Sequence, residues 1–254
     1  MDTRASTSSR SVAAAIAALS LAPLAAPAAA NACPLALVLA IDVSSSVDDS
    51  EYELQRRGLA EAFRDPQVAA AIRATGGLLA SAFEWSGREQ QVVQADWTWL
   101  ETPEEIARFA DRLEGTPRSH HRYPTALGYA LGYAAIHHGR APRDCARRVV
   151  DMAGDGINNE GFPPESAYRA FDYSAITVNG LAIAGDDPDP VRYYGDRVIR
   201  GPGAFVEVAR GFGDYARAMK RKLLREIDGP PLAFAPGERP APEFQRQSRL
   251  DEAP

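Results

Sequence analysis

Residues 35–49 read LALVLAIDVSSSVDD, and this stretch determines the fold that the sequence predicts. Residues 35–41 are all aliphatic, which is typical of a strand buried on both faces, as in a parallel sheet covered by helices. Asp42, Ser44 and Ser46 follow at the carboxyl end of that strand, where open α/β sheets bind their ligands. One carboxylate and two hydroxyls, placed just before a predicted helix, are oxygen ligands suited to a hard cation such as Mg²⁺.

Length and composition allow one large α/β domain and place few limits on function. The chain has 254 residues, of which 45% are apolar and 24% charged, as in an average soluble globular protein. Its formal net charge is −6, with acids and bases distributed throughout. Because nucleic-acid-binding proteins usually carry a basic patch or a basic overall balance, this charge argues against such a partner.

The first 32 residues have the features of a secretory signal peptide rather than of folded structure. Two early arginines precede an apolar stretch over residues 12–24, and residues 30–32 form a small-x-small cleavage signal. We therefore expect export into a periplasm or the medium, with a mature chain that begins near Cys33. No stretch is long enough for an ordinary transmembrane helix. A lipid anchor on Cys33 is the alternative, but Ala30 stands where a lipoprotein signal normally has Leu.

Strand patterns alternate with helix patterns along the rest of the chain, which predicts an α/β fold with a doubly wound, mostly parallel sheet of six strands. Residues 86–89 form a short link containing Gly, so the second and third strands should be antiparallel at a sheet edge. The domain should extend over residues 33–228, and residues 229–254, rich in Pro, Glu and Arg, should form a disordered tail. The predicted strands are residues 35–41, 78–85, 90–95, 147–153, 176–183 and 204–208.

Two more polar residues are expected at the same edge of the sheet as Asp42. Asp155 follows the strand at residues 147–153. Thr125 lies in the loop that leads into the helix before that strand. If the strands at residues 35–41 and 147–153 are neighbours, their carboxyl ends flank the point where the strand order reverses, and both acids face one crevice. The sequence therefore predicts a single site made from three separate segments.

Together these motifs resemble the von Willebrand factor type A (vWA) domain and its metal-ion-dependent adhesion site. The matching elements are D-x-S-x-S from Asp42, Thr125 in TALGYAL and Asp155 in GDG, and the resemblance covers roughly residues 35–227. More narrowly, the chain is similar to an exported bacterial branch known chiefly as a domain of unknown function. The resemblance implies that the ion is bound directly by Ser44, Ser46 and Thr125, and directly or through water by Asp42 and Asp155.

The resemblance implies a binding protein rather than an enzyme. A Mg²⁺ site with several neutral hydroxyls and few direct carboxylates leaves the ion strongly electrophilic, and an open position can accept a Glu or Asp from a protein partner. Mn²⁺ or Ca²⁺ would suit the same types of ligand. We therefore expect an exported, non-enzymatic domain that captures an acidic residue of a protein partner through a bound divalent cation.

Two other functions, one structural and one enzymatic, are compatible with the same residues. A structural envelope protein would use the ion only to stabilise its fold. A metal-dependent phosphatase or hydrolase of the dehalogenase type would want a second Asp two residues after the first, and that position is Ser44. The sequence has no G-x-S-x-G nucleophile elbow and no Walker-type phosphate loop. Taken alone, Ser44 and Ser46 could also simply cap the next helix.

The two cysteines fit the expected sheet. Cys33 lies nine residues before Asp42 and Cys145 lies ten before Asp155, so both should lie at the amino ends of adjacent parallel strands. Neighbouring strands are within disulfide reach, and exported proteins meet oxidising conditions. We predict a Cys33–Cys145 disulfide at the end of the sheet opposite the metal.

The remaining polar pairs have simpler interpretations. Asn158 and Asn159 are expected to form a turn, and the acids at residues 186, 187 and 189 are expected to precede a helix. Histidines 120 and 121 should be exposed in a loop. Histidines 137 and 138 should end a helix, where imidazolium suits the helix dipole.

Overall fold

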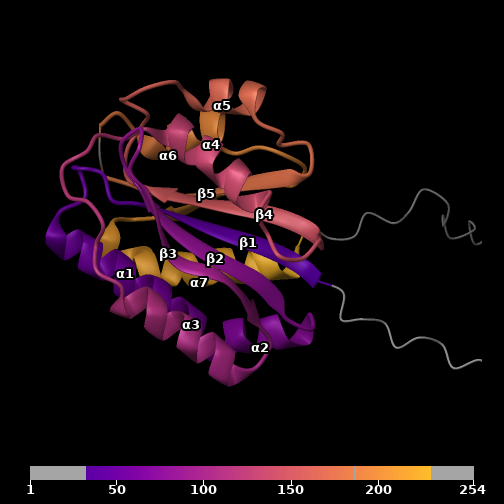
Figure 1. The fold of residues 1–254 in the computed structure, drawn as a ribbon. Coiled ribbons are helices and arrows are strands. Elements are labelled where there is room, and N and C mark those ends of the chain that lie inside the picture. Colours follow the sequence, from indigo (N-terminus) through magenta and orange to yellow (C-terminus); the bar gives the residue numbers. More distant parts are fainter. Residues whose placement is uncertain (1–32, 186, 230–254) are drawn as a thin grey trace, which may run out of the picture. The chain divides into compact units, whose positions relative to one another are not determined.

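The structure, a computed structural model, describes residues 33–185 and 187–229. Within this part of the chain, six strands form one sheet in the order β3-β2-β1-β4-β5-β6, and every neighbouring pair is parallel except β2 and β3. The predicted fold class, a doubly wound and mostly parallel sheet with one antiparallel edge strand, is confirmed (Figure 1). The strands are β1 (Cys33–Asp42), β2 (Leu78–Trp85), β3 (Gln91–Leu100), β4 (Cys145–Gly154), β5 (Ile176–Ile183) and β6 (Val206–Ala209).

Helices cover both faces of this sheet. Four of those described, α1, α2, α3 and α7, lie on one face, and α4, α5 and α6 lie on the other (Figure 1). A π-helical turn, η1 (Tyr194–Val198), continues α6, and a 3₁₀ turn, η2 (Phe212–Asp214), leads into α7. The α-helices are α1 (Asp49–Arg64), α2 (Pro66–Ala74), α3 (Pro103–Gly115), α4 (Leu127–His138), α5 (Pro164–Ala170), α6 (Pro190–Tyr193) and α7 (Tyr215–Asp228).

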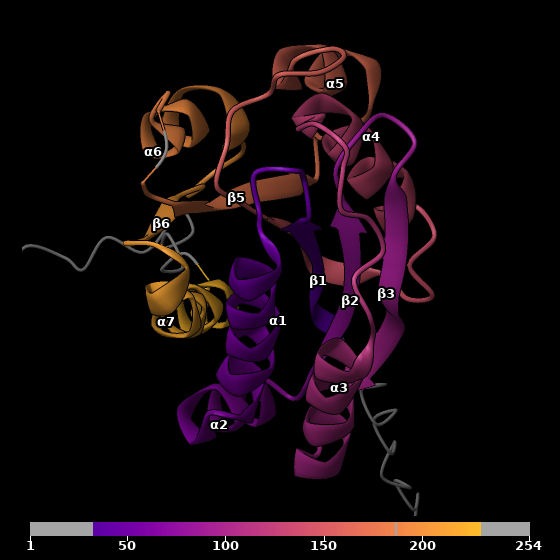
Figure 2. The ribbon, with the colours of Figure 1, turned by 90° about the vertical axis from the view of Figure 1, so that its left-hand side faces the viewer.

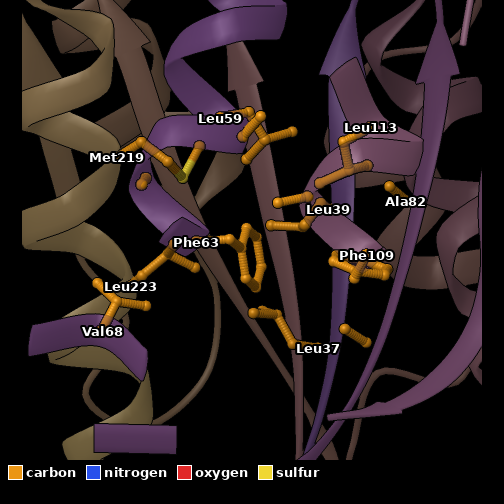
Figure 3. Close-up of a cluster of buried hydrophobic side chains, with 14 of the residues drawn as sticks. Leu37, Leu39, Leu59, Phe63, Val68, Ala82, Phe109, Leu113, Met219 and Leu223 are labelled. Atoms are coloured by element: carbon orange, nitrogen blue, oxygen red, sulfur yellow. The ribbon is translucent and has the colours of Figure 1, made fainter. Parts of the chain in front are cut away.

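The aliphatic run of β1 is explained by this double cover. Leu37 and Leu39 point into the larger core, where the rings of Phe63 on α1 and Phe109 on α3 meet edge to face at 5.1 Å between centroids (Figure 3). Val38, between the two leucines, lies in the core on the opposite face. Because successive side chains of a strand point to opposite faces, a strand covered on both faces needs apolar residues at every position.

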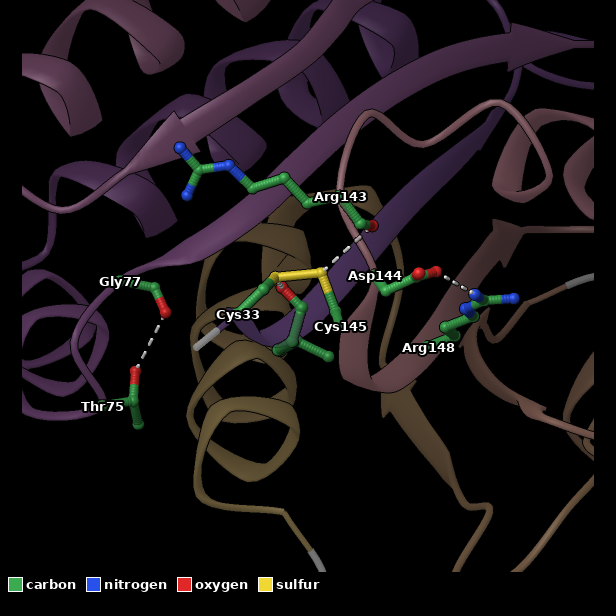
Figure 4. The surroundings of a disulfide bond; sticks show 8 residues. Cys33, Thr75, Gly77, Arg143, Asp144, Cys145 and Arg148 are labelled. Atoms are coloured by element: carbon green, nitrogen blue, oxygen red, sulfur yellow. Dashed lines mark hydrogen bonds and ion pairs between the residues drawn. A yellow bond between two sulfur atoms is a disulfide. The ribbon is translucent and has the colours of Figure 1, made fainter. Parts of the chain in front are cut away.

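The amino ends of β1 and β4 are joined covalently. The parallel register places Cys33 opposite Cys145, with 4.5 Å between their Cα atoms, and the structure contains the disulfide between them (Figure 4). The bridge closes a loop whose ends are 112 residues apart in sequence. It therefore ties together the two strands whose other ends carry the candidate site.

The edge strand β3 is longer than the sequence predicted. Its prediction covered residues 90–95, whereas β3 continues to Leu100. Trp97 and Trp99 pack against a small cluster formed by Cys33 and other buried residues, and this contact extends the strand past the predicted end. The indole rings are shielded from solvent because β3 pairs with β2.

α4 ends at His138, as predicted, but His137 and His138 are both buried, so they are not the imidazolium ions that were expected there. His137 stacks on Trp97 with ring centroids 5.1 Å apart, and its Nε2 lies 2.8 Å from the hydroxyl of Ser81. His138 is 2% exposed, and its Nε2 donates to Val149 O at 3.0 Å. Burial lowers the pKa of His138 to about 4, because removal from water disfavours the charged ring.

Several predictions concern residues outside the described part of the chain. These are the signal peptide over residues 1–32, the tail beyond Gly229, and the acid at residue 186. None of the helices described is long and apolar enough to cross a membrane.

The buried His138 predicts a loss of stability in mild acid. In the unfolded chain an imidazole titrates near its ordinary pKa of about 6.5, whereas in the folded chain the pKa is about 4, so the unfolded state binds more protons between these values. The free energy of unfolding should therefore fall by about 2 kcal/mol between about pH 7.5 and pH 5 through this residue alone.

Urea denaturation of the wild type and of His138→Gln at both pH values measures this contribution. The variant keeps a side-chain donor for Val149 O, and it should lose about 2 kcal/mol less than the wild type on acidification. Equal acid sensitivity of the two proteins would show that His138 is not the titrating group.

Candidate metal centre

The carboxyl ends of β1 and β4 lie side by side and carry the two predicted acids. β1 ends at Asp42, while β4 ends at Gly154 and is followed at once by Asp155. The parallel register pairs Ile41 with Ala153, so both acids leave the sheet at the same edge. Both carboxylates are buried, with Asp42 fully covered and Asp155 4% exposed.

Hydrogen bonds through two serines link these acids. The backbone N–H of Ser44 donates to Asp42 Oδ1 at 2.7 Å, which folds the loop back onto the end of β1. The hydroxyls of Ser44 and Ser46 lie 3.1 Å apart, and Ser46 Oγ donates to Asp155 Oδ1 at 2.9 Å. Ser44 is buried and Ser46 is exposed, so the cluster opens to solvent at Ser46.

The serines are not the cap of the following helix. α1 is capped by Asp48, whose Oδ1 accepts from the backbone N–H of Glu51 at 2.8 Å, while Glu51 Oε2 accepts from the backbone N–H of Asp48 at 2.9 Å. This reciprocal capping box satisfies backbone donors in the first turn of α1. The capping interpretation of Ser44 and Ser46 is therefore wrong, and their hydroxyls face the two acids instead.

Thr125 reaches the same place from the loop before α4. It is 3% exposed, and its Oγ1 faces Gly156, where an added Cβ would lie 3.6 Å away. Asn159 holds it there, because Asn159 Oδ1 accepts from Thr125 N at 2.8 Å and Thr125 O accepts from Asn159 N at 3.0 Å. All three segments predicted to form the site therefore converge.

The two asparagines bind the segment before α4 and the first turn of that helix; neither lies in a turn, so the prediction that they form one is wrong. Ala126, the N-cap residue of α4, has no side chain that can accept a hydrogen bond. Asn158 Oδ1 instead accepts from the backbone N–H of Gly128, in the first turn of α4, at 3.2 Å. An unpaired N–H in the first turn of a buried helix would be unfavourable. Asn158 and Asn159 thus fasten the loop after β4 to the first turn of α4 and to Thr125, a link that no pattern in the sequence predicted.

The ligand chemistry and one unpaired carboxylate oxygen fit a hard divalent cation. Asp42 Oδ2 is buried and has no hydrogen-bond partner in the described structure. Burial and the neighbouring charge of Asp155 raise the pKa of Asp42 well above the usual aspartate value, and hydrogen bonds from Ser44 offset this only in part. A divalent cation beside both carboxylates would favour their charged forms.

Hydroxyls would complete the ligand set of such a site. In the described part of the chain, no three or more His, Cys, Asp or Glu side chains cluster as potential metal ligands. Two carboxylates and three hydroxyls make an all-oxygen set, which suits Mg²⁺, Mn²⁺ or Ca²⁺ better than a metal that prefers nitrogen or sulfur.

Gly154 is required where β4 approaches Asp42. A Cβ at this position would lie 2.8 Å from Asp42 Oδ2 and 2.5 Å from the hydroxyl of Tyr194, both closer than real Cβ contacts. Tyr194, in η1, is fully buried, and burial followed by the charge of Asp42 raises the pKa of its phenol well above the usual value. Its neutral hydroxyl therefore borders the acid, although its sequence position carried no signal of this role.

Arg118 is the main residue that the sequence did not identify. Its Nη2 donates to the carbonyls of Val43, Ser44 and Val47 at 3.2, 3.2 and 2.8 Å, and its side chain is 5% exposed. Its Nη1 also lies 3.2 Å from Asp49 Oδ1. A rigid guanidinium fork thus binds three carbonyls of the loop between β1 and α1 and fixes the path of D-x-S-x-S.

Of the other polar residues near this edge, His121 and Asp189 have the roles that were predicted, whereas His120 is half-buried against the ring of Tyr123 rather than exposed. His121 is exposed, and its Nδ1 lies 3.3 Å from Asp49 Oδ1. Asp189 precedes α6 and caps it, since its Oδ1 accepts from Val191 N at 2.9 Å. Neither residue joins the cluster formed around Asp42 and Asp155.

The contacts of Arg118 predict that Arg118→Lys loosens the loop between β1 and α1. The single ammonium of Lys cannot donate both to His120 O, as Arg118 Nε does at 2.7 Å, and to the loop carbonyls, as Nη2 does. Loss of even one charge-assisted hydrogen bond to the loop, about 1.5 kcal/mol, should speed amide hydrogen exchange over residues 43–47 about tenfold. Mass-spectrometric hydrogen exchange measures this rate. Arg148→Lys is the control, because Arg148 pairs with the exposed Asp144. Unchanged exchange in Arg118→Lys would show that these bonds do not hold the loop.

Solved structures with this fold share little sequence with the chain. Proximal thread matrix protein 1 from the mussel byssus is 14% identical with a TM-score of 0.57, covering 78% of this chain and 48% of its own. A von Willebrand factor type A protein from Catenulispora acidiphila is 14% identical with a TM-score of 0.56, covering 77% and 43%. The manganese-loaded TRAP protein of Plasmodium vivax is 16% identical with a TM-score of 0.50, covering 76% and 73%.

These comparisons establish the fold and the family. The chain spans less than half of the length of the first two structures, and at such low identity the likeness concerns the fold alone. No curated protein matches the sequence. Residues 32–231 match the family described as protein of unknown function DUF1194. The chain therefore belongs to that family, and its fold is that of vWA domains.

Proposed function

We propose that this chain is an exported, non-enzymatic binding domain that holds a divalent cation and captures an acidic residue of a protein partner. The observation that carries the proposal is the all-oxygen cluster, buried except at Ser46, in which Asp42 Oδ2 has no hydrogen-bond partner in the described structure. The residues that would hold the ion, directly or through water, are Asp42, Ser44, Ser46, Thr125 and Asp155.

The composition of the cluster favours binding over a closed structural site. Three of its five side chains are neutral hydroxyls, so a bound ion would keep net positive charge and could accept a further carboxylate at an open position. The cluster opens to solvent at Ser46, which is where a partner would approach. A structural role for the ion, the second candidate, would require no such opening.

Mg²⁺ is the ion that we propose, with Mn²⁺ or Ca²⁺ as alternatives. Mg²⁺ keeps several waters and takes few protein carboxylates, as the two acids here would allow. Among proteins with the same fold, mussel proximal thread matrix protein 1 has been solved with zinc in its metal-ion-dependent adhesion site (MIDAS) motif. The TRAP protein has been solved with manganese. These proteins support a divalent cation in general.

Export and the absence of catalysis are also part of the proposal. The Cys33–Cys145 disulfide suits an oxidising compartment such as a periplasm or the medium. Ser44 stands two residues after Asp42, where a phosphatase of the dehalogenase type would need an acid. Release of phosphate from generic substrates in Mg²⁺, abolished in Asp42→Asn, would replace the proposal with an enzyme.

The proposal predicts that Asp42→Asn lowers the affinity for Mg²⁺. Even residues that only support a ligand change metal affinity by about 10-fold to 100-fold, so loss of this carboxylate should cost at least about tenfold. Isothermal calorimetry with Mg²⁺ and Mn²⁺ gives the affinity. Thermal unfolding adds a second reading, since a ligand at about 100 times its Kd stabilises the folded state by about 2.7 kcal/mol.

Asp48→Asn is the matched control. It removes an exposed negative charge close to the cluster while keeping a side chain that caps α1, so metal affinity should stay near that of the wild type. If the wild type binds no divalent cation, or if both variants bind as the wild type does, the proposed metal centre is wrong. If the ion stabilises the fold and no acidic ligand binds the loaded protein, the structural alternative is correct.

A further inference from the structure

The hydroxyl of Tyr194 lies close to the carboxylate of Asp42. Tyr194 begins η1, which continues α6 and lies over β5, on the face of the sheet opposite to α1 and α7 (Figure 2). A Cβ placed on Gly154 would lie 2.5 Å from Tyr194 Oη and 2.8 Å from Asp42 Oδ2, so these two oxygens cannot be further apart than the sum of those distances. Two hydrogen bonds of about 2.8 Å joined by one water would span that separation.

Neither oxygen has a hydrogen-bond partner among the residues that the structure describes. Tyr194 Oη and Asp42 Oδ2 are both buried and both unpaired there. A phenol hydroxyl can donate and a carboxylate oxygen accepts, so the two groups are complementary. Because a buried polar group without a partner is unfavourable, a bond between these two would satisfy both at once.

Two glycines on neighbouring strands make room for the ring of Tyr194. A Cβ on Gly180 of β5 would lie 2.7 Å from Tyr194 Cδ1, and a Cβ on Gly154 of β4 would meet its hydroxyl. A side chain at either position would displace the ring. The ring is therefore fixed along its length, and its hydroxyl is held at the Asp42 end.

The backbone that carries Tyr194 is also unusual. η1 is a π-helical turn, in which the backbone N–H of Ile199 donates to Tyr194 O at 3.0 Å. Such turns are rare and occur frequently at functional sites. A residue that served only to fill the core would need no hydroxyl, since Phe has almost the same volume.

We propose that Tyr194 is a positioning residue of the metal centre, which donates to Asp42 Oδ2 directly or through one water and thereby favours Mg²⁺ over Ca²⁺. Asp42 Oδ1 already accepts from Ser44 N at 2.7 Å, so the carboxylate is then held at both oxygens. Mg²⁺ demands near-ideal octahedral geometry, whereas Ca²⁺ accepts flexible geometry and often takes both oxygens of one carboxylate. This inference rests on the proposed function, because an ion must first bind there.

Tyr194→Phe tests the inference, since it removes only the hydroxyl. Partners of metal ligands change metal affinity by about 10-fold to 100-fold, so the affinity for Mg²⁺ should fall about tenfold. The affinity for Ca²⁺ should fall by less than about threefold, because Ca²⁺ tolerates a carboxylate that has turned. Isothermal calorimetry on the chain purified after export gives both affinities. In chelator, the midpoint of thermal unfolding should not fall, since the lost hydroxyl was unpaired.

Tyr215→Phe is the matched control. Tyr215 is also fully buried with a hydroxyl that is unpaired in the described structure, but it begins α7 on the other face of the sheet and packs against Gly58 of α1. This variant should bind both ions as the wild type does. Equal losses of affinity in Tyr194→Phe and Tyr215→Phe would overturn the inference, because the effect would then belong to any buried phenol.

A crystal structure of the wild type loaded with Mg²⁺ shows the contact itself, whether or not the variant folds. Tyr194 Oη should lie within about 3 Å of Asp42 Oδ2, or of a water that is also bonded to Oδ2. A hydroxyl bonded to neither would overturn the inference.

The outcomes separate the two proposals. If the wild type binds neither ion, the proposed metal centre fails, and the role of Tyr194 fails with it. If the wild type binds Mg²⁺ and Asp42→Asn weakens that binding, the metal centre stands. If in that case Tyr194→Phe keeps both the affinity for Mg²⁺ and the preference over Ca²⁺, only the role of Tyr194 is overturned.

Discussion

The pairing of β1 with β4 is the interaction on which the rest of this structure depends. Their parallel register places Cys33 opposite Cys145 at one end and brings Asp42 beside the start of the Asp155 loop at the other. Because the strands are central in the sheet and buried on both faces, neither can shift without exposing its aliphatic residues. Two buried carboxylates are thereby held close together despite their repulsion.

Side-chain hydrogen bonds also hold the loops at this edge. Arg118 binds the carbonyls of the loop after β1, and Asn159 exchanges hydrogen bonds with Thr125. Gly154 lets β4 approach the carboxylate of Asp42 without a clash. The oxygen atoms of the cluster are therefore positioned before any ion binds, which lowers the cost of arranging them around a cation.

The sequence was most informative where local pattern and chemistry coincide. The aliphatic run of β1, the spacing of D-x-S-x-S, and the placement of Thr125 and Asp155 predicted the sheet and the convergence of the cluster. Arg118, Asn158 and Asn159 could not be predicted, because they act on backbone atoms of segments distant in sequence. The burial of His137 and His138 depends on Trp97 of β3, which packs against both rings.

The central claim, that this cluster binds a divalent cation, is tested most directly by anomalous diffraction from crystals soaked in Mn²⁺. A single strong peak is predicted within about 2.5 Å of the hydroxyl oxygens of Ser44 and Ser46, the upper range for oxygen ligands of hard cations. It should be absent from Asp42→Asn crystals soaked in the same way. No peak at the cluster at saturating Mn²⁺, or a peak only elsewhere on the chain, would contradict the claim.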